Sequence, residues 1–107
     1  MKFHKITQNE WGKLNIVEQM ANVGSEVSRT INWKRRSKED AEISFRRALE
    51  LLLFTIMDPK NKVRLSELTR VKETLCDWYT KGGKYSTTDN DWQKYFLEFA
   101  IASRINR

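Results

Sequence analysis

Residues 37–59, SKEDAEISFRRALELLLFTIMDP, contain the signals that decide the fold of this chain. Ser37 can accept a hydrogen bond from the backbone of Asp40 and so begin a helix. Asp58 ends the helix, because the residue before a proline is pushed out of the helical region. Between these ends, apolar residues recur at steps of three and four, as on the core-facing stripe of a helix. They are Ala41, Phe45, Ala48, Leu49, Leu52 and Ile56.

Similar signals mark three other helices. A capping box, in which a threonine and an acidic residue three positions later exchange hydrogen bonds with the backbone, begins two of them. The two pairs are Thr7 with Glu10 and Thr88 with Asp91. Asp58 and Pro59 suit the cap and the first residue of another helix, and Gly82-Gly83 suits its end.

These signals predict helices over about residues 8–34, 38–57, 59–81 and 89–105. Their short connections favour antiparallel neighbours. The sequence therefore predicts one all-α domain over residues 1–107, an antiparallel up-and-down four-helix bundle with short loops. A length of 107 residues leaves no room for a second core.

Composition and apolar patterning indicate the cellular compartment of the chain. The single cysteine, Cys76, forms no internal disulfide, which suits a reducing compartment. No apolar run approaches the roughly 20 residues that span a bilayer, and the first residues lack a signal-peptide pattern. We therefore expect a cytoplasmic protein without a membrane partner.

Apolar residues also lie outside the core stripes of two predicted helices. They are Ile43, Leu51, Phe54 and Met57 in residues 38–57, and Leu97, Ile101 and Ile105 in residues 89–105. A helix of a monomeric bundle should have one apolar stripe and one wet face, and each exposed side chain of this kind forgoes about 1.5–3 kcal/mol. These residues therefore predict an interface with a second copy or a partner protein. The alternative is that the termini or the loop in the 80s cover them.

The position of the two helices would decide the assembly. If they are diagonal in the bundle, their outer faces point apart and favour a ring; if they are adjacent, they favour a two-fold dimer. A patch of small residues on the first helix predicts a tight internal helix crossing rather than a ligand cleft. It consists of Ala21, Gly24, Ser25 and Ser28.

A basic cluster supports an alternative function. It consists of Trp33, Lys34, Arg35 and Arg36, with Arg47 in the next helix. An indole beside cations can stack on a base while the cations hold phosphates, which suits an RNA-binding or other nucleic-acid-binding accessory protein. The plainer alternatives are that the cations complement the helix dipole and that Arg47 pairs with Glu50.

Catalytic motifs are not visible in the sequence. His4 and Cys76 stand alone, no His/Cys/carboxylate cluster suggests a metal site, and no Gly-rich phosphate loop occurs. We therefore expect a protein without enzyme activity or cofactor. A hydrolase or transferase would require ionisable side chains that converge in a cleft.

Residues 21–27, ANVGSEV, and 47–51, RALEL, with Asp58-Pro59 after them, resemble a family of small uncharacterised bacterial and archaeal helical proteins. That resemblance covers most of the chain and implies no activity. More distantly, the layout resembles the HEPN-type bundles that accompany nucleotidyltransferases or act as ribonucleases. The Arg-x4-6-His motif of the ribonucleases is absent, so this likeness implies a partner role without RNase activity. The chain also loosely resembles basic helical accessory proteins that bind RNA beside a reverse transcriptase.

Overall fold

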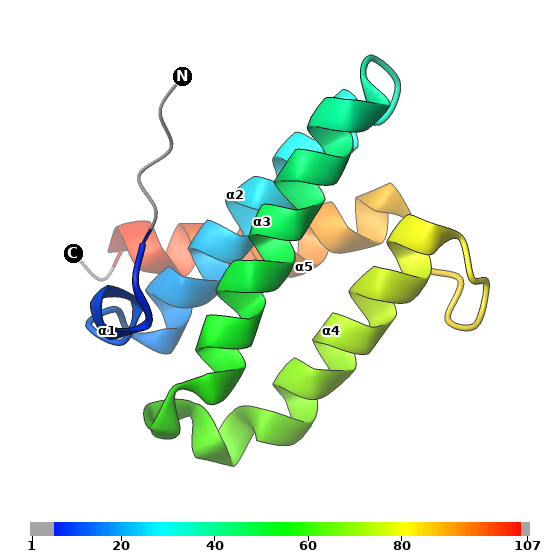
Figure 1. Cartoon of the computed structure of the whole chain (residues 1–107). Coiled ribbons are helices and arrows are strands. Elements are labelled where there is room, and N and C mark those ends of the chain that lie inside the picture. Colours follow the sequence, from blue (N-terminus) through cyan, green and yellow to red (C-terminus); the bar gives the residue numbers. More distant parts are fainter. Residues whose placement is uncertain (1–5, 106–107) are drawn as a thin grey trace.

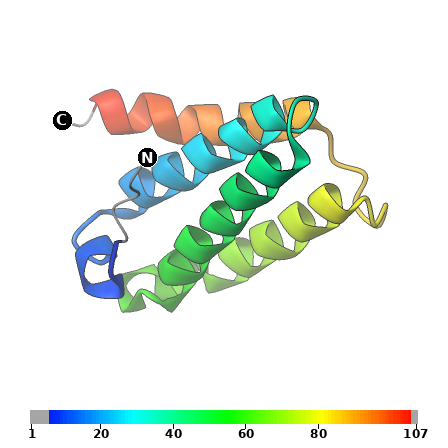
Figure 2. The same ribbon diagram turned by 45° about the horizontal axis from the view of Figure 1, so that its top comes forward.

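The computed structural model describes residues 6–105, which form an all-α bundle (Figure 1). The α-helices are α1 (Gln8–Trp11), α2 (Ile16–Trp33), α3 (Lys38–Met57), α4 (Leu65–Thr80) and α5 (Asp89–Ile105), and a 3-10 helix, η1 (Pro59–Arg64), joins α3 to α4. The four long helices alternate in direction along the chain (Figures 1 and 2), so the predicted all-α, up-and-down bundle is confirmed. The bounds of α3 and α5 agree with the predicted helices over 38–57 and 89–105.

Helix α2 is the centre of the bundle. It packs along α3 on one side and along α5 on the other, whereas α4 packs on α3. Figure 2 shows the order α5, α2, α3, α4 across the molecule. Helices α3 and α5 are therefore separated by α2, so the faces that they turn outward belong to different sides of the protein.

The predicted first helix, residues 8–34, is two helices. Gly12 ends α1, and Asn15 begins α2 with a capping box of its own: its side chain accepts from the backbone N–H of Glu18 at 2.8 Å, and Glu18 Oε1 accepts from the backbone N–H of Asn15 at 3.1 Å. The break lets α1 cross to the end of α3, where Gln8 Nε2 donates to the carbonyl of Phe54 at 2.9 Å.

The predicted third helix, residues 59–81, also begins differently. Asp58 caps it as expected, but the first six residues form the 3-10 turn η1, and α4 starts only at Leu65. Helix α4 ends at Thr80, and Lys81 rather than Gly82 is its left-handed C-cap, with φ of 59°; Gly83 also has a positive φ, of 77°. The segment that leads from α3 into α4 is therefore the tight turn η1, and most of its side chains are exposed.

The core between the helices is rich in aromatic rings. Phe45 of α3 stacks on Tyr79 of α4 with ring centroids 4.0 Å apart, and Trp78 of α4 contacts Trp92 of α5 at 6.5 Å. Three of the four tryptophans are buried: Trp11, Trp78 and Trp92. Large rings thus fill the space between α4 and α5, whose backbones have little direct contact.

A buried polar network ties α1, α2, α3 and η1 together where they meet. Gln19 Nε2 donates to Asp58 Oδ2 at 2.9 Å, and Asn61 Nδ2 donates to Gln19 Oε1 at 2.8 Å and to the carbonyl of Thr55 at 2.9 Å. Trp11 Nε1 donates to Thr55 Oγ1 at 2.9 Å. Burial of a polar group is unfavourable mainly when the group lacks a hydrogen-bond partner. The network therefore fixes the arrangement of α1, α2, α3 and η1 where they meet.

Asp58 is the one carboxylate of the network. Burial alone would raise its pKa, but hydrogen bonds from Lys60 and Gln19 favour the ionised form and bring the pKa below its ordinary value of 3.8. Lys60 Nζ lies 2.7 Å from Asp58 Oδ2 and is half-exposed. The charge is therefore neutralised locally, as a structural ion pair requires.

Candidate functional site

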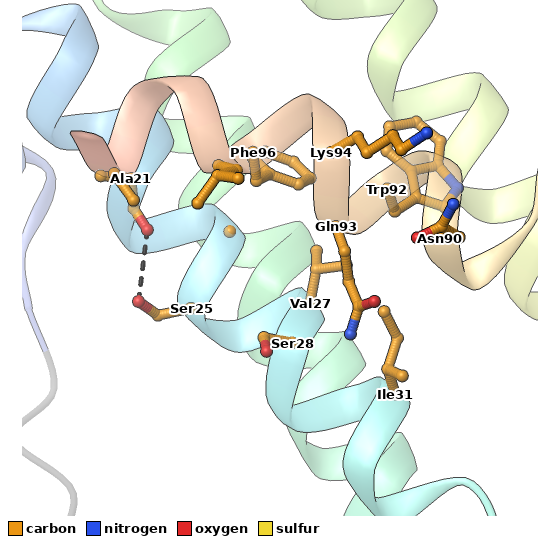
Figure 3. A pocket seen from close by; sticks show the side chains of 13 residues that line it. Ala21, Ser25, Val27, Ser28, Ile31, Asn90, Trp92, Gln93, Lys94 and Phe96 are labelled. Carbon is orange, nitrogen blue, oxygen red and sulfur yellow. Dashed lines mark hydrogen bonds between the residues drawn. The ribbon is translucent and has the colours of Figure 1, made fainter. Parts of the chain in front are cut away.

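A groove runs between α2 and α5 on the side of the molecule away from α3 (Figure 3). Its volume is about 450 Å³. Small residues of α2 line one side, namely Ala21, Ser25 and Ser28, and α5 supplies Phe96, Leu97 and Ala100 on the other. Most of the lining is therefore apolar or small.

Gly24 determines how closely α2 and α5 approach each other at this groove. A Cβ placed at Gly24 would lie 2.6 Å from Cβ and 2.8 Å from Cγ of Phe96. Real contacts of this kind are about 3.5–4.0 Å, so only glycine allows α5 to cross α2 this closely. The tight helix crossing expected from the small-residue patch is confirmed at this position.

Polar groups gather at the end of the groove nearer the start of α5. In Figure 3, Gln93 extends from α5 toward Ser28 and Ile31 of α2. Ser25 Oγ donates to the carbonyl of Ala21 at 3.3 Å, a local bond within α2. The polar side chains of the groove therefore lie mainly at one end, and the rest of the groove suits a row of apolar side chains.

An exposed apolar stripe lies beside the groove on α5. Leu97, Ile101 and Ile105 are 55%, 47% and 74% exposed. Their spacing of four residues places them along one face of the helix, and Leu97 forms part of the groove wall. No segment within residues 6–105 covers the stripe, so the loop in the 80s is not its cover.

The predicted interface residues of α3 differ from one another in how exposed they are. Ile43 and Met57 are 54% and 65% exposed as expected, but the prediction for Leu51 is wrong, because Leu51 is only 5% exposed and belongs to the core. Phe54 is half-buried and packs against the core. Helix α3 buries a wider arc than one stripe because it contacts both α2 and α4.

Ile43 and Met57 do not form one patch. They are 14 positions apart, about 21 Å along a helix, and the outward positions between them include the charged Arg46 and Glu50. A contiguous apolar surface is what marks an interface. The structure therefore places the candidate site on α5 and the α2/α5 groove, and the α3 residues lie outside it.

The predicted nucleic-acid contacts are divided between two places. Lys34 and Arg35 lie at the end of the bundle near Asp89. Arg47 instead lies in a groove of about 790 Å³ between α2 and α3, together with Trp33. Charges cancel in this second groove, because its lining contains three arginines and three acidic residues: Arg29, Arg46, Arg47, Glu26, Asp40 and Glu50.

Ion pairs in the α2/α3 groove are local. Arg29 pairs with Glu26 at 2.9 Å, and Arg47 pairs with Glu50 at 3.5 Å. The plainer interpretation of Arg47, a pair with Glu50, is confirmed. A phosphate chain would gain little from a groove in which every cation already faces an acid.

Reactive side chains do not converge in the described part of the chain. Cys76 is half-buried at the edge of the core, and His4 lies outside the described residues. Within residues 6–105, no three His, Cys, Asp or Glu side chains are grouped to hold a metal ion. Burial and the neighbouring Glu67 carboxylate raise the pKa of Tyr95, so this hydroxyl stays protonated and donates to Glu67 Oε2 at 3.3 Å.

Comparison with protein-family models, curated proteins and solved structures finds no match. Of the helices within residues 6–105, none combines the length and apolar character needed to cross a membrane. The geometry of the chain itself is therefore the basis for a functional assignment.

Proposed function

We propose that this protein is a non-catalytic helical module that associates with a second copy of itself through α5 and the α2/α5 groove. The observation that supports the proposal is that the exposed stripe begins at the groove, where Leu97 forms part of the wall, and continues along α5 through Ile101 and Ile105. Leu97 and Ile101 are large and project from the surface, whereas Ala21, Ser25 and Ser28 leave space next to them. The same face of the protein thus has both the projecting apolar side chains and the groove that would receive those of a second copy.

This arrangement favours a two-fold dimer over a ring. A two-fold interface uses the same patch on both copies, so that patch must be complementary to itself. A ring needs two different patches, whereas the exposed Leu97 and the groove that it lines belong to one face. The α5 stripe of one copy would therefore enter the α2/α5 groove of the other, and the reverse contact would form at the same time.

The expected affinity is modest. Leu97 and Ile101 are about half-exposed and Ile105 is about three-quarters exposed, so complete burial adds those shares of the usual 1.5–3 kcal/mol per residue, or roughly 5–11 kcal/mol over both copies. This gain is comparable to the 4–15 kcal/mol that association costs in lost freedom. Contacts within the groove must therefore supply the remaining binding free energy, and we expect dissociation constants in the micromolar range.

Sedimentation equilibrium over a concentration range from about 1 μM to 1 mM tests the proposal. The wild-type chain should shift from monomer to dimer. Leu97→Glu with Ile101→Glu should remain monomeric, because two carboxylates would have to be buried in each half of the interface. Ile43→Glu with Met57→Glu is the matched control, since it adds the same charges at equally exposed positions of α3, and it should dimerise like the wild type.

A second variant tests the groove without changing the stripe. Ser25 is exposed on α2, and its hydroxyl bonds only within its own helix. Ser25→Tyr should therefore preserve the fold but fill the groove and weaken dimerisation at least tenfold. A wild-type chain that stays monomeric throughout, or a control variant that loses dimerisation as fully as the stripe variant, would refute the proposal.

A further inference from the structure

Two connecting segments lie at the same end of the bundle but apart from each other (Figure 1): the α2–α3 turn with the last residue of α2, residues 33–36, and the α4–α5 loop, residues 81–88. Lys34 contacts the helix ends that flank the loop, because its Nζ lies 2.9 Å from Asp89 Oδ1 at the start of α5 and 4.6 Å from the ring of Trp78 near the end of α4. We call these two segments the basic end.

Several cations of the basic end have no acidic partner. Arg35, Arg36, Lys81 and Lys84 are exposed, and within the described residues no carboxylate lies within 4.0 Å of their charged groups. This differs from the α2/α3 groove, where arginines face glutamates at short range.

Two of the nearby acids, Asp77 and Asp89, are already occupied by the protein itself, whereas Glu39 and Asp40 follow the α2–α3 turn in the first turn of α3. Asp77 accepts the backbone N–H groups of Lys84 and Tyr85, both at 3.0 Å, and Asp89 accepts Lys34 Nζ and Trp78 Nε1, both at 2.9 Å. Burial would raise the pKa of Asp89, but these bonds and the charges of Lys34 and Arg35 lower it below 3.8. Asp77 and Asp89 therefore hold the loop and Lys34 in place, whereas Arg35, Arg36, Lys81 and Lys84 face solvent.

Each segment also presents an aromatic ring beside a cation. Arg36 lies 5.7 Å from the ring of Trp33, which is 36% exposed, and Lys84 lies 5.4 Å from the ring of the half-buried Tyr85. A hollow of about 400 Å³ is lined by Lys34 and Lys81, by the hydroxyl-bearing Ser86, Thr87 and Thr88, and by the carboxylates of Asp77 and Asp89, which already accept the hydrogen bonds described above. Hydroxyls and ammonium groups are typical donors to phosphate oxygens.

We infer that the basic end binds single-stranded nucleic acid, with Arg35, Arg36, Lys81 and Lys84 along the phosphate chain and the rings of Trp33 and Tyr85 stacked on bases. Aromatic rings reach base faces only where the strand is unpaired, so a single strand fits better than a duplex. An anionic membrane fits less well, because membrane-surface sites combine cations with exposed aliphatic side chains, and residues 33–36 and 81–88 present none. This function is separate from dimerisation, since no residue of the α5 stripe takes part.

Fluorescence anisotropy with labelled oligouridylate and oligothymidylate tests the inference. Strands of about 20 nucleotides exceed the roughly 4–16 that a small domain covers. The wild-type chain should bind at low salt and weaken as salt rises. Arg35→Ala with Lys84→Ala should weaken binding at least tenfold and reduce the slope of log K against log salt by about 1.4, because each lost phosphate contact to a single strand contributes about 0.7.

Two controls separate the site from general charge. Arg29→Ala with Arg46→Ala removes the same number of cations from ion pairs of α2 and α3 and should change binding less than about threefold. Tyr85→Leu keeps the charge and should weaken binding to the single strands severalfold, with little change for a duplex of the same length.

The inference is overturned if the wild-type chain does not bind either strand in low salt, or if both double variants lose affinity equally. Equal binding of duplex and single strand, unchanged by Tyr85→Leu, also overturns it. So does binding to phosphatidylserine vesicles but not to the oligonucleotides. Circular dichroism checks that each variant is folded, which is expected where exposed residues are replaced and where the half-buried Tyr85 is replaced by another apolar side chain.

Discussion

Gly24→Ala measures how closely α2 and α5 depend on each other. The added methyl group would lie 2.6 Å from Cβ of Phe96, an atom fixed to the α5 backbone, and 2.8 Å from its Cγ. Restoring an ordinary contact requires α5 to move by about 1 Å. A rotamer change cannot relieve the contact, because Cβ keeps its position relative to the helix.

The magnitude follows from two opposing terms. Overpacking in a well-packed contact costs typically 1–3 kcal/mol, whereas replacing glycine by alanine inside a helix gains about 0.5–1 kcal/mol. The difference between these ranges is about 0–2.5 kcal/mol, and we expect a net loss near its middle, about 1 kcal/mol in the free energy of unfolding. For a chain of this size, that loss lowers the melting temperature by roughly 4–8 °C.

Urea and thermal denaturation measure this change, with Ser25→Ala as the control. Ser25 is exposed on the same helix and makes only a local bond to Ala21, so its replacement should leave stability unchanged or raise it slightly. A Gly24→Ala protein as stable as the wild type, or more stable, would show that α5 does not cross α2 at this distance. The dimer should weaken in parallel, because displacement of α5 alters the groove.

Two other predictions concern the buried polar network. Asn61→Ala leaves Gln19 Oε1 and the carbonyl of Thr55 without this donor, so we expect a loss of about 2–5 kcal/mol in urea unfolding, whereas Asn32→Ala at an exposed position should cost under about 0.5 kcal/mol. Because the folded-state pKa of Asp58 is below its ordinary value, the carboxylate stabilises the fold above about pH 4, and this contribution is lost as the pH falls through the folded-state pKa. Asp58→Asn should therefore flatten the dependence of stability on pH between about pH 2.5 and 5; an equally steep dependence in the variant would contradict this role.

Local signals predicted the ends of helices where a side chain caps the backbone. Ser37 and Thr88 begin α3 and α5 where the sequence indicates. The break between α1 and α2 was missed because apolar spacing continues across it and Gly12 has an ordinary right-handed conformation. Asn15 with Glu18 was the signal that could have located it, since this pair forms the same capping box that identified the other helices.

The spacing of apolar residues along the sequence does not predict which distant segments pack together. Leu51 lies beside the main stripe of α3, and its burial depends on α3 having neighbours on two sides. The polar network joins Gln19 to residues about 40 positions away in the chain, and no local pattern indicates such partners. The small residues of α2 did predict a close crossing, but Phe96 as the contacting residue could be identified only from the structure.

The central position of α2 also determines where this chain can tolerate sequence change. Because α2 has a neighbour on each side, its exposed positions form a narrow strip, which consists of Glu18, Asn22, Ser25, Arg29 and Asn32 with Trp33 at its end. Part of that strip borders the α2/α5 groove. Homologous chains could therefore diverge in whether they pair with themselves or with one another by exchanging a few of these polar residues, while every side chain that holds the helices together stays the same.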